Sequence, residues 1–343
     1  MTKNGISKIY AVIIILILVV AVTASLVYYY YYMQRPVERI SITIAVTHPE
    51  ADVESAIWFV PIYKGLFEKY GLNVKYLDVA GGSGECIRLL IEGSVDVAFI
   101  ASYTMLAPRA EGADVRIVAS LTFGSVPLGV IVPPDSPIKS YADLKGKSVG
   151  VSRPGSGSYI GAKVIMYAMN FTENDMKIVP LGSLDAILAA LKKGQIDAGV
   201  WTITQCLLLE QKGEFRSIKP FINTLVPHAN VMPGRVLITT PQYAKNNPEA
   251  IKRLINVFVE AAKIWKENKK WVYDAILRNA SLYALSEPLA DFMYNEHIRV
   301  VEDCGIYITG VQAMIDVFRE VGVYSGKLTV DDIIIRGFVP IHG

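Results

Sequence analysis

Small polar residues gather at one turn between a predicted strand and a predicted helix. Ser156, Gly157 and Ser158 follow an apolar strand predicted at 148–151 and open a helix predicted at 159–170. The first amides of a helix have no carbonyl partner within it and carry partial positive charge. Together with serine hydroxyls, such amides can hold an anionic or polar small molecule without a lysine. A strand-to-helix turn also needs glycine and serine for its own geometry, so the turn alone does not distinguish a binding site from a helix cap.

Further candidates lie where other predicted strands end, because ligands of open α/β sheets gather at the carboxyl ends of the strands. Both halves of the chain place small polar residues and aromatic rings there: Trp58, Ser83, Ser102, Tyr103 and Thr122 in the first half, and Arg153, Ser156, Gly157, Ser158 and Trp201 in the second. Two such faces meeting across a cleft would enclose one small molecule, with rings covering it and N–H groups contacting its polar atoms.

Arg153 would then be a bidentate partner for a sulfonate, carboxylate or phosphate group. Each candidate also has a structural interpretation. Trp58 and Trp201 could be packing residues, the serines could be caps only, and Arg153 could be a solvated loop residue.

Motifs of catalysis and of metal or nucleotide binding are absent from the sequence. It contains no G-x-S-x-G or H-E-x-x-H motif, no phosphate-binding loop with its lysine, and no dinucleotide fingerprint after a strand. The four histidines and three cysteines are widely spaced, which does not suit a metal site. We therefore expect no cofactor, no bound metal and no enzymatic activity. An extracellular enzyme stays open as an alternative, with Arg153 and His48 as the residues to test.

The N-terminal region is apolar. Residues 9–33 contain no charged side chain, and a stretch of about 25 residues is long enough to cross the hydrocarbon core of a membrane. Lys3 and Lys8 precede it, which favours an N-terminus inside the cell and the remainder outside. We predict an uncleaved transmembrane helix, with residues 1–38 serving as anchor and linker. A cleaved signal peptide is the alternative.

The remainder of the chain has no net charge. Only Lys3 and Lys8 of the chain's 34 basic residues lie in 1–33, which contain none of its 32 acidic residues. The exported part therefore has as many basic as acidic side chains, which argues against nucleic acid as a partner. We expect a monomer.

Strands alternate with helices from residue 40 to about residue 240, which is typical of an α/β fold with a mostly parallel sheet. The rest is predicted to be mostly helical, at 249–266, 270–280, 287–301 and 310–321. Segments 92–100 and 193–201 resemble each other, because each ends a helix, passes a glycine and enters a strand through Asp96 or Asp197. This repeat predicts two lobes that are built alike, each with its own sheet.

The segment DSPIKSYADLKGKSVGV, residues 135–151, closely resembles the start of the second lobe in solute-binding proteins of the nitrate, sulfonate, taurine and thiamine-precursor group of ABC importers. Residues 62–74 and the two G-x-x-D elements are also similar to that group. The resemblance implies a two-lobe type II periplasmic-binding-protein fold with a hinge. Lobe 1 would comprise 39–126 plus 231–343, and lobe 2 would comprise 127–230.

The same resemblance implies a function. The chain would be a membrane-tethered extracytoplasmic solute-binding protein that delivers a small organic anion, such as an alkylsulfonate, taurine or a nitrate-like ion, to an ABC permease and its ATPase. Ser83, Ser102, Ser156 and Ser158 match positions that contact the anion in this group. A neutral thiamine-precursor-like pyrimidine is an alternative ligand. An extracellular enzyme on the same fold and the sensor domain of a receptor are alternative functions.

Overall fold

A computed structural model describes the backbone of residues 3–33, 39–47, 49, 53–79 and 81–343, and the side chains of 13–28 and of 39 onward with the same gaps. The chain forms two compact units, Met1–Arg39 and Ile40–Gly343, and each is described by itself. In the first unit, helix α1 (Lys3–Met33) exposes all of its described side chains, Ile13 to Tyr28. Within the described residues, no helix combines the length and apolarity needed to cross a membrane. The transmembrane helix therefore stays a prediction.

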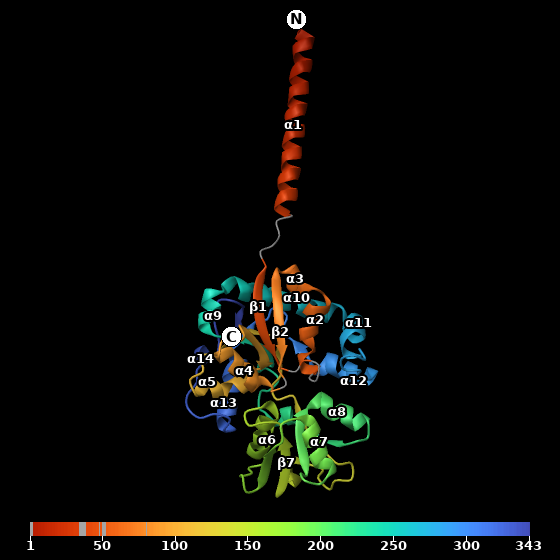
Figure 1. The fold of residues 1–343 in the computed structure, drawn as a ribbon, viewed down its shortest axis with the longest axis vertical. Coiled ribbons are helices and arrows are strands. Elements are labelled where there is room, and N and C mark those ends of the chain that lie inside the picture. The colour runs from red at the N-terminus through yellow and green to blue at the C-terminus, as the bar shows by residue number, and fades with distance from the viewer. Residues whose placement is uncertain (1–2, 34–38, 48, 50–52, 80) are drawn as a thin grey trace. The chain divides into compact units, whose positions relative to one another are not determined.

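The first sheet of the second unit has five strands in the order β2-β1-β3-β11-β4. Figure 1 labels two of them, β1 and β2, which lie side by side. The strands are β1 (Ile40–Val46), β2 (Leu72–Asp78), β3 (Val97–Ala101), β4 (Arg116–Ser120) and β11 (Arg235–Thr239). Strand β1 pairs in parallel with β2 and β3, whereas β11 runs antiparallel between β3 and β4. The start of β11 therefore lies at the edge of the sheet where β1 and β3 end.

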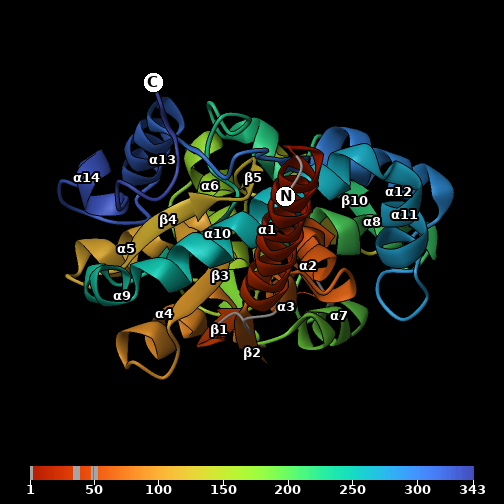
Figure 2. The ribbon, with the colours of Figure 1, turned by 90° about the horizontal axis from the view of Figure 1, so that it is seen from above.

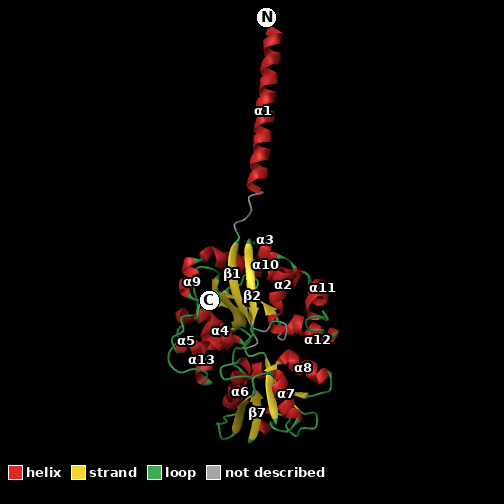
Figure 3. Ribbon diagram, viewed as in Figure 1, coloured by secondary structure: helices red, strands yellow, loops and turns green. Residues whose placement is uncertain are grey.

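The second sheet also has five strands, in the order β10-β6-β9-β7-β8, and Figure 3 shows it apart from the first. The strands are β6 (Leu128–Val132), β7 (Lys147–Val151), β8 (Met176–Pro180), β9 (Ala198–Thr202) and β10 (Arg216–Ile218). Strand β7 pairs in parallel with β8 and β9, and β6 runs antiparallel between β9 and β10. In reverse, the order is β8-β7-β9-β6-β10, which corresponds strand by strand to β2-β1-β3-β11-β4. In each sheet three parallel strands are followed by one antiparallel strand and then by an edge strand that is antiparallel to it. The prediction of two sheets that are built alike is confirmed, whereas the lobe boundaries stay a prediction.

Two aspartates occupy matching places in the two sheets. Asp96 Oδ2 accepts a hydrogen bond from the Thr43 amide at 2.7 Å, and Asp197 Oδ2 accepts one from the Ser148 amide at 2.8 Å. Each carboxylate ties the residue before one strand to the neighbouring parallel strand. The sequence repeat around these aspartates thus has a structural cause rather than a role in binding.

The lobe boundaries given above place the first sheet in lobe 1 and the second in lobe 2, and we use these names below. The helices of lobe 2 are η3 (Tyr141–Leu144), α6 (Gly157–Ala168), α7 (Leu184–Lys192), α8 (Ile203–Gln211) and η4 (Ile222–Leu225). Those of the first half of lobe 1 are η1 (Val53–Trp58), α2 (Phe59–Tyr63), α3 (Leu66–Lys69), α4 (Ser83–Ile91), η2 (Ser102–Met105) and α5 (Leu106–Ala110).

The C-terminal part of lobe 1 is mostly helical, as the sequence predicts. Its helices are α9 (Pro241–Asn246), α10 (Pro248–Glu267), α11 (Lys269–Val272), η5 (Tyr273–Leu277), α12 (Glu287–Phe292), η6 (Met293–His297), α13 (Ile308–Glu320) and α14 (Val330–Ile333). Figure 2 shows α11 and α12 on one side of lobe 1 and α13 and α14 on the other. Strands β13 (Ile306–Tyr307) and β14 (Ile341–His342) form a small parallel pair.

The helix predicted at 287–301 is too long. The helix ends at His297, and β12 (Arg299–Val300) pairs antiparallel with β5 (Thr122–Phe123). Val300 is buried in the core of lobe 1, so tertiary pairing overrides the helical pattern there.

Candidate ligand-binding cleft

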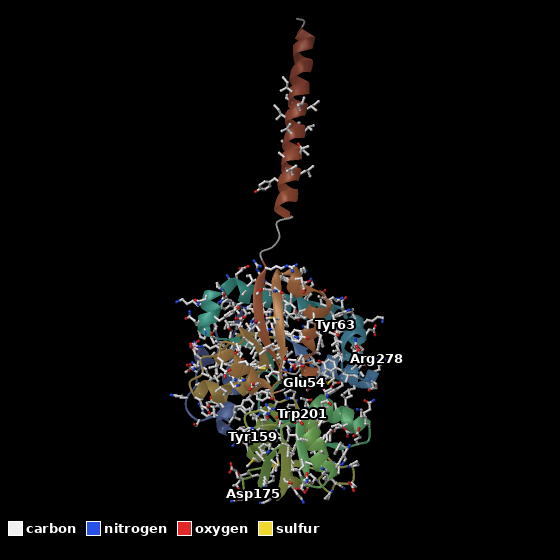
Figure 4. All side chains as sticks on the ribbon, in the orientation of Figure 1. Glu54, Tyr63, Tyr159, Asp175, Trp201 and Arg278 are labelled. Atoms are coloured by element: carbon white, nitrogen blue, oxygen red, sulfur yellow. The ribbon has the colours of Figure 1, made fainter. Side chains whose placement is uncertain are left out.

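A cavity of about 410 Å³, called cavity A below, is lined by residues of both lobes. Its volume lies within the range of small-molecule sites. The structure brings seven of the predicted site residues to its walls: Ser83, Tyr103, Arg153, Ser156, Gly157, Ser158 and Trp201. Figure 4 labels Trp201 in the region where the two lobes meet.

The N-terminus of α6 forms part of the lobe 2 wall of cavity A. Ser156 is its N-cap, and its Oγ accepts a hydrogen bond from the Tyr159 amide at 3.3 Å. Ser158 Oγ accepts one from the Ser152 amide at 2.9 Å and lies 3.1 Å from Ser156 Oγ. Both serines therefore have structural roles. Ser156 Oγ also accepts from the Arg153 amide at 3.4 Å, and Ser158 Oγ lies 3.1 Å from Ser152 Oγ, so each hydroxyl has three partners. A hydroxyl that contacts a ligand must exchange one of these contacts for it.

The N-terminus of α4 lies on the lobe 1 wall of the same cavity. Gly82 precedes it with a φ of 76°, a conformation that glycine adopts without strain. Ser83 Oγ lies 3.4 Å from Thr47 Oγ1, which also lines cavity A and was not predicted from the sequence. Lobe 1 thus contributes the N-terminus of α4 to the cavity, and lobe 2 contributes those of α6, α7 and α8, whose N-caps Ser156, Ser183 and Thr202 line it. Partial positive charge from both lobes therefore lies at this cavity.

Two glycines let the lobes approach closely across the cleft. A Cβ added to Gly157 in lobe 2 would lie 2.9 Å from the hydroxyl oxygen of Tyr103 in lobe 1. A Cβ added to Gly81 in lobe 1 would lie 2.9 Å from Nη1 of Arg153 in lobe 2. Arg153 therefore reaches across to the other lobe, although much of its side chain is exposed. The two lobes therefore contact each other across the cleft.

Arg235 is a site residue that the sequence analysis missed. It is 6% exposed, lines cavity A and begins β11, opposite Ala101 at the end of β3. Burial lowers the pKa of its guanidinium to about 10, so the side chain stays positively charged at neutral pH. Its place at the cleft depends on the antiparallel direction of β11, because an arginine at the start of a parallel strand would lie at the opposite edge.

A second cavity of about 330 Å³, called cavity B, adjoins the first. Ala101, Tyr103 and Arg235 line both cavities. Glu54 of η1 also lines cavity B, and its Oε1 lies 2.9 Å from Nε2 of His297. Burial raises the pKa of Glu54 to about 8 and lowers that of His297 to about 4, so both side chains are uncharged near neutral pH. Neither residue was predicted as a site residue.

Three predicted site residues lie elsewhere. Thr122 lines cavity B rather than cavity A, and its Oγ1 accepts a hydrogen bond from the Arg235 amide at 2.8 Å. Ser102 is fully buried, lines neither cavity and donates its hydroxyl hydrogen to the Pro233 carbonyl.

Trp58 is a core residue of lobe 1. It has no exposed surface, and its ring centroid lies 5.5 Å from that of Phe99 and 5.8 Å from that of Phe258. It lines neither cavity, so the structure favours packing over ligand contact, and we leave Trp58 and Ser102 out of the proposed site.

Metal-binding clusters are not found among the described residues, where no three His, Cys, Asp or Glu side chains come together to hold an ion. His48, the partner of Arg153 in the enzymatic alternative, lies outside the described residues.

Comparison with known proteins identifies the family. The model of the family described as NMT1/THI5 like matches residues 53–270, and the chain belongs to this family. A relative from Brucella abortus, whose name proposes only a binding protein, is 26% identical over 203 residues, which are 58% of this chain and 59% of the relative. The chain thus matches less than two thirds of that relative's length. A relative from Bacillus subtilis, whose name proposes aliphatic sulfonates as its ligand, is 23% identical over 70% of this chain and 73% of its own.

Solved structures share the fold. The alkanesulfonate-binding protein SsuA of Xanthomonas axonopodis, bound to MOPS, superposes with a TM-score of 0.71 at 16% identity, covering 88% of this chain and 100% of its own. A Candida albicans protein described as having the generic periplasmic binding protein fold gives 0.73 at 17% identity, covering 89% and 99%. The desulfurization enzyme DszB gives 0.58 at 16% identity, covering 88% and 97%. The fold is therefore a two-sheet periplasmic-binding-protein fold, as the resemblance implied.

Proposed function

We propose that this protein is an extracytoplasmic solute-binding protein of an ABC importer and that it binds a small organic anion between its two lobes. The observation that carries this proposal is the meeting of two helix N-termini, α4 from lobe 1 and α6 from lobe 2, at cavity A. Because each lobe supplies part of the anion site, a bound anion stabilises the closed arrangement over an open one.

An alkylsulfonate suits this cavity. Its three oxygens accept hydrogen bonds from helix amides and serine hydroxyls, and Arg153 and Arg235 add positive charge nearby. Trp201 and Leu128, which also line the cavity, offer apolar surface for a short alkyl chain. The names of the Bacillus and Xanthomonas proteins support the same ligand class.

The apolar segment 9–33 leads to a second part of the proposal. It would tether the binding unit to the membrane beside a permease and its ATPase, to which the closed, loaded form delivers its ligand. Separation of the expressed protein into membrane and soluble fractions tests this part. Recovery of the full-length chain from the soluble fraction alone contradicts it.

A neutral aminopyrimidine is the second candidate ligand. The rings of Tyr103 and Trp201 at cavity A favour it, because both could cover a flat heterocycle. An enzymatic function on this fold has a precedent in DszB, and turnover of the bound ligand would reveal it.

The binding experiment compares butane-1-sulfonate with butan-1-ol, which has the same chain but no charge. A ligand at about one hundred times its Kd raises the free energy of unfolding by about 2.7 kcal/mol, which is readily measured as a rise in Tm. We expect a rise with the sulfonate and none with the alcohol. Equal effects of the two compounds, or a response to an aminopyrimidine alone, contradict the anion site.

A further inference from the structure

Two N-x-S/T sequences occur in the chain, and the function proposed above uses neither of them. They are Asn170-Phe171-Thr172 and Asn279-Ala280-Ser281. This pattern is the acceptor for N-linked glycans in exported proteins, but it also arises by chance. The structure distinguishes the two asparagines by what their side chains contact.

Asn279 uses both polar atoms of its carboxamide within the protein. Its Nδ2 donates to the Ala275 carbonyl at 3.1 Å, and its Oδ1 accepts from the Ser281 amide at 2.8 Å. The residue is half-buried and follows η5 closely. The atom that would receive a glycan therefore contacts the backbone of the protein rather than solvent.

Asn170 ends α6 through its backbone alone. Its φ is 52°, its amide donates to the Tyr167 carbonyl at 3.1 Å, and the Phe171 amide donates to the Met166 carbonyl at 2.7 Å. This arrangement is a Schellman C-cap, in which asparagine can take the left-handed position. The cap explains the residue type without using its side chain. Asn170 is exposed, and its carboxamide has no hydrogen bond to any described residue.

The hydroxyl residue of the same sequence also lies at the surface. Thr172 is exposed, and its Oγ1 donates to Oδ2 of Asp175 at 2.7 Å. An exposed hydrogen bond of this kind contributes little net stability, because water or an approaching enzyme can replace it. Asn170 and Thr172 are therefore both accessible in the folded protein.

A third cavity of about 370 Å³, called cavity C, lies beside Asn170. It opens at the surface, because Tyr167, Asn170, Thr172 and Glu173 line it with exposed side chains. The Tyr167 residue is 46% exposed, and its hydroxyl donates to Oε2 of Glu320 at 3.1 Å, which holds the ring. The C–H face of a sugar packs well on an aromatic ring, so cavity C offers space and an apolar wall for a first sugar.

We propose that Asn170 is an attachment site for an N-linked glycan, whose first sugar lies in cavity C. This inference rests on the part of the proposed function that places the binding unit outside the cell. The donor is a lipid-linked sugar phosphate or pyrophosphate, and a glycosyltransferase of the cell catalyses the transfer. Nδ2 of Asn170 forms a bond to C1 of the sugar as the bond between C1 and the phosphate oxygen breaks. The lipid phosphate leaves with the electron pair of that bond, and the amide nitrogen loses one proton.

Mass spectrometry of the full-length protein, purified from the cells that naturally produce it, tests this inference. Trypsin yields peptide 164–177 around Asn170 and peptide 279–299 around Asn279. We expect loss of most of the unmodified 164–177 signal, with heavier forms in its place that release sugar ions on fragmentation. Peptide 279–299 should keep its unmodified mass.

Substitutions within peptide 164–177 show which residues the modification needs. Asn170→Gln and Thr172→Val each remove one element of the acceptor sequence and should abolish the modification, whereas Thr172→Ser keeps a hydroxyl and should retain it. Asn174→Gln is the matched control, because Asn174 is an exposed asparagine of the same peptide that has Met176 rather than a hydroxyl residue two positions later. Urea denaturation of each variant checks that it is folded.

The outcomes separate this inference from the proposed function. Protease added to cells whose outer envelope has been removed digests the binding unit only if this unit lies outside the membrane. An unmodified peptide 164–177 in protein that the protease reaches overturns the glycan at Asn170, while the solute-binding proposal stands. An unmodified peptide in protein that the protease does not reach overturns both the glycan and the extracytoplasmic placement. Equal modification of Asn170 and Asn279, or a modified peptide 164–177 in Asn170→Gln, overturns the assignment to Asn170.

Discussion

Replacing Glu54 by glutamine should change how the stability of the protein depends on pH. Burial raises the pKa of Glu54 from 4.5 to about 8, and burial lowers that of its partner His297 from 6.5 to about 4. Between about pH 4.5 and 6.5 the two groups change the free energy of unfolding in opposite directions as the pH rises. The folded protein keeps a proton on Glu54 that the unfolded chain releases, and it lacks a proton that unfolded His297 binds.

Above pH 6.5 only the Glu54 contribution is left. The folded protein then holds one proton more than the unfolded chain, so the free energy of unfolding falls as the pH rises toward 8. At about 1.4 kcal/mol for each pH unit, the loss over this interval is about 2 kcal/mol. Glutamine does not titrate and can keep a hydrogen bond to His297. The substitution therefore removes this pH-dependent loss in the free energy of unfolding while His297 keeps a partner.

Urea denaturation at pH 6.5 and pH 8.0 measures the effect. We expect the original protein to lose about 2 kcal/mol more than Glu54→Gln over this interval. Glu296→Gln is the matched control, because Glu296 lines the same cavity but is exposed, and it should behave like the original protein. An equal loss in the original protein and in Glu54→Gln would refute the assignment of a buried, protonated Glu54.

Three further predictions concern the cleft and the core. Gly157→Ala should weaken butane-1-sulfonate binding about tenfold, because the new Cβ would lie 2.9 Å from the hydroxyl of Tyr103, whose ring stacks on Phe318. Titration calorimetry measures the change in Kd, and an unchanged Kd contradicts the close approach of the lobes at Gly157. Ser156→Ala should weaken the same binding by a similar factor. Its control is Ser140→Ala, which removes a cap of η3 outside both cavities and should lower only the free energy of unfolding, by about 1 kcal/mol. Equal effects of the two substitutions on affinity would contradict a site at α6. Trp58→Ala should destabilise lobe 1 by about 3–5 kcal/mol in denaturant, and loss of affinity in protein that is still folded would return Trp58 to the site.

Much of the architecture could be predicted because local signals agree with it. Strands β1, β3, β7 and β9 are apolar runs bounded by glycine or by polar residues, and the matching hydrogen bonds of Asp96 and Asp197 leave a visible repeat. The serines of α6 could be found because a helix cap has a recognisable composition.

The rest depends on tertiary structure. Arg235 lies at the cleft only because β11 is antiparallel, and strand direction is not encoded in the pattern of five residues. Glu54 reads as an ordinary acid in a first helical turn, and its partner His297 is distant in sequence. Trp58 follows a predicted strand as a site residue would, yet four aromatic neighbours from separate segments surround it.

A crystal structure with butane-1-sulfonate tests the central proposal most directly. The proposal expects the sulfonate in cavity A, with oxygens within hydrogen-bonding distance of the α6 N-terminus in lobe 2 and of Ser83 in lobe 1. A sulfonate that contacts one lobe only, or that lies outside cavity A, would contradict an anion held between the lobes.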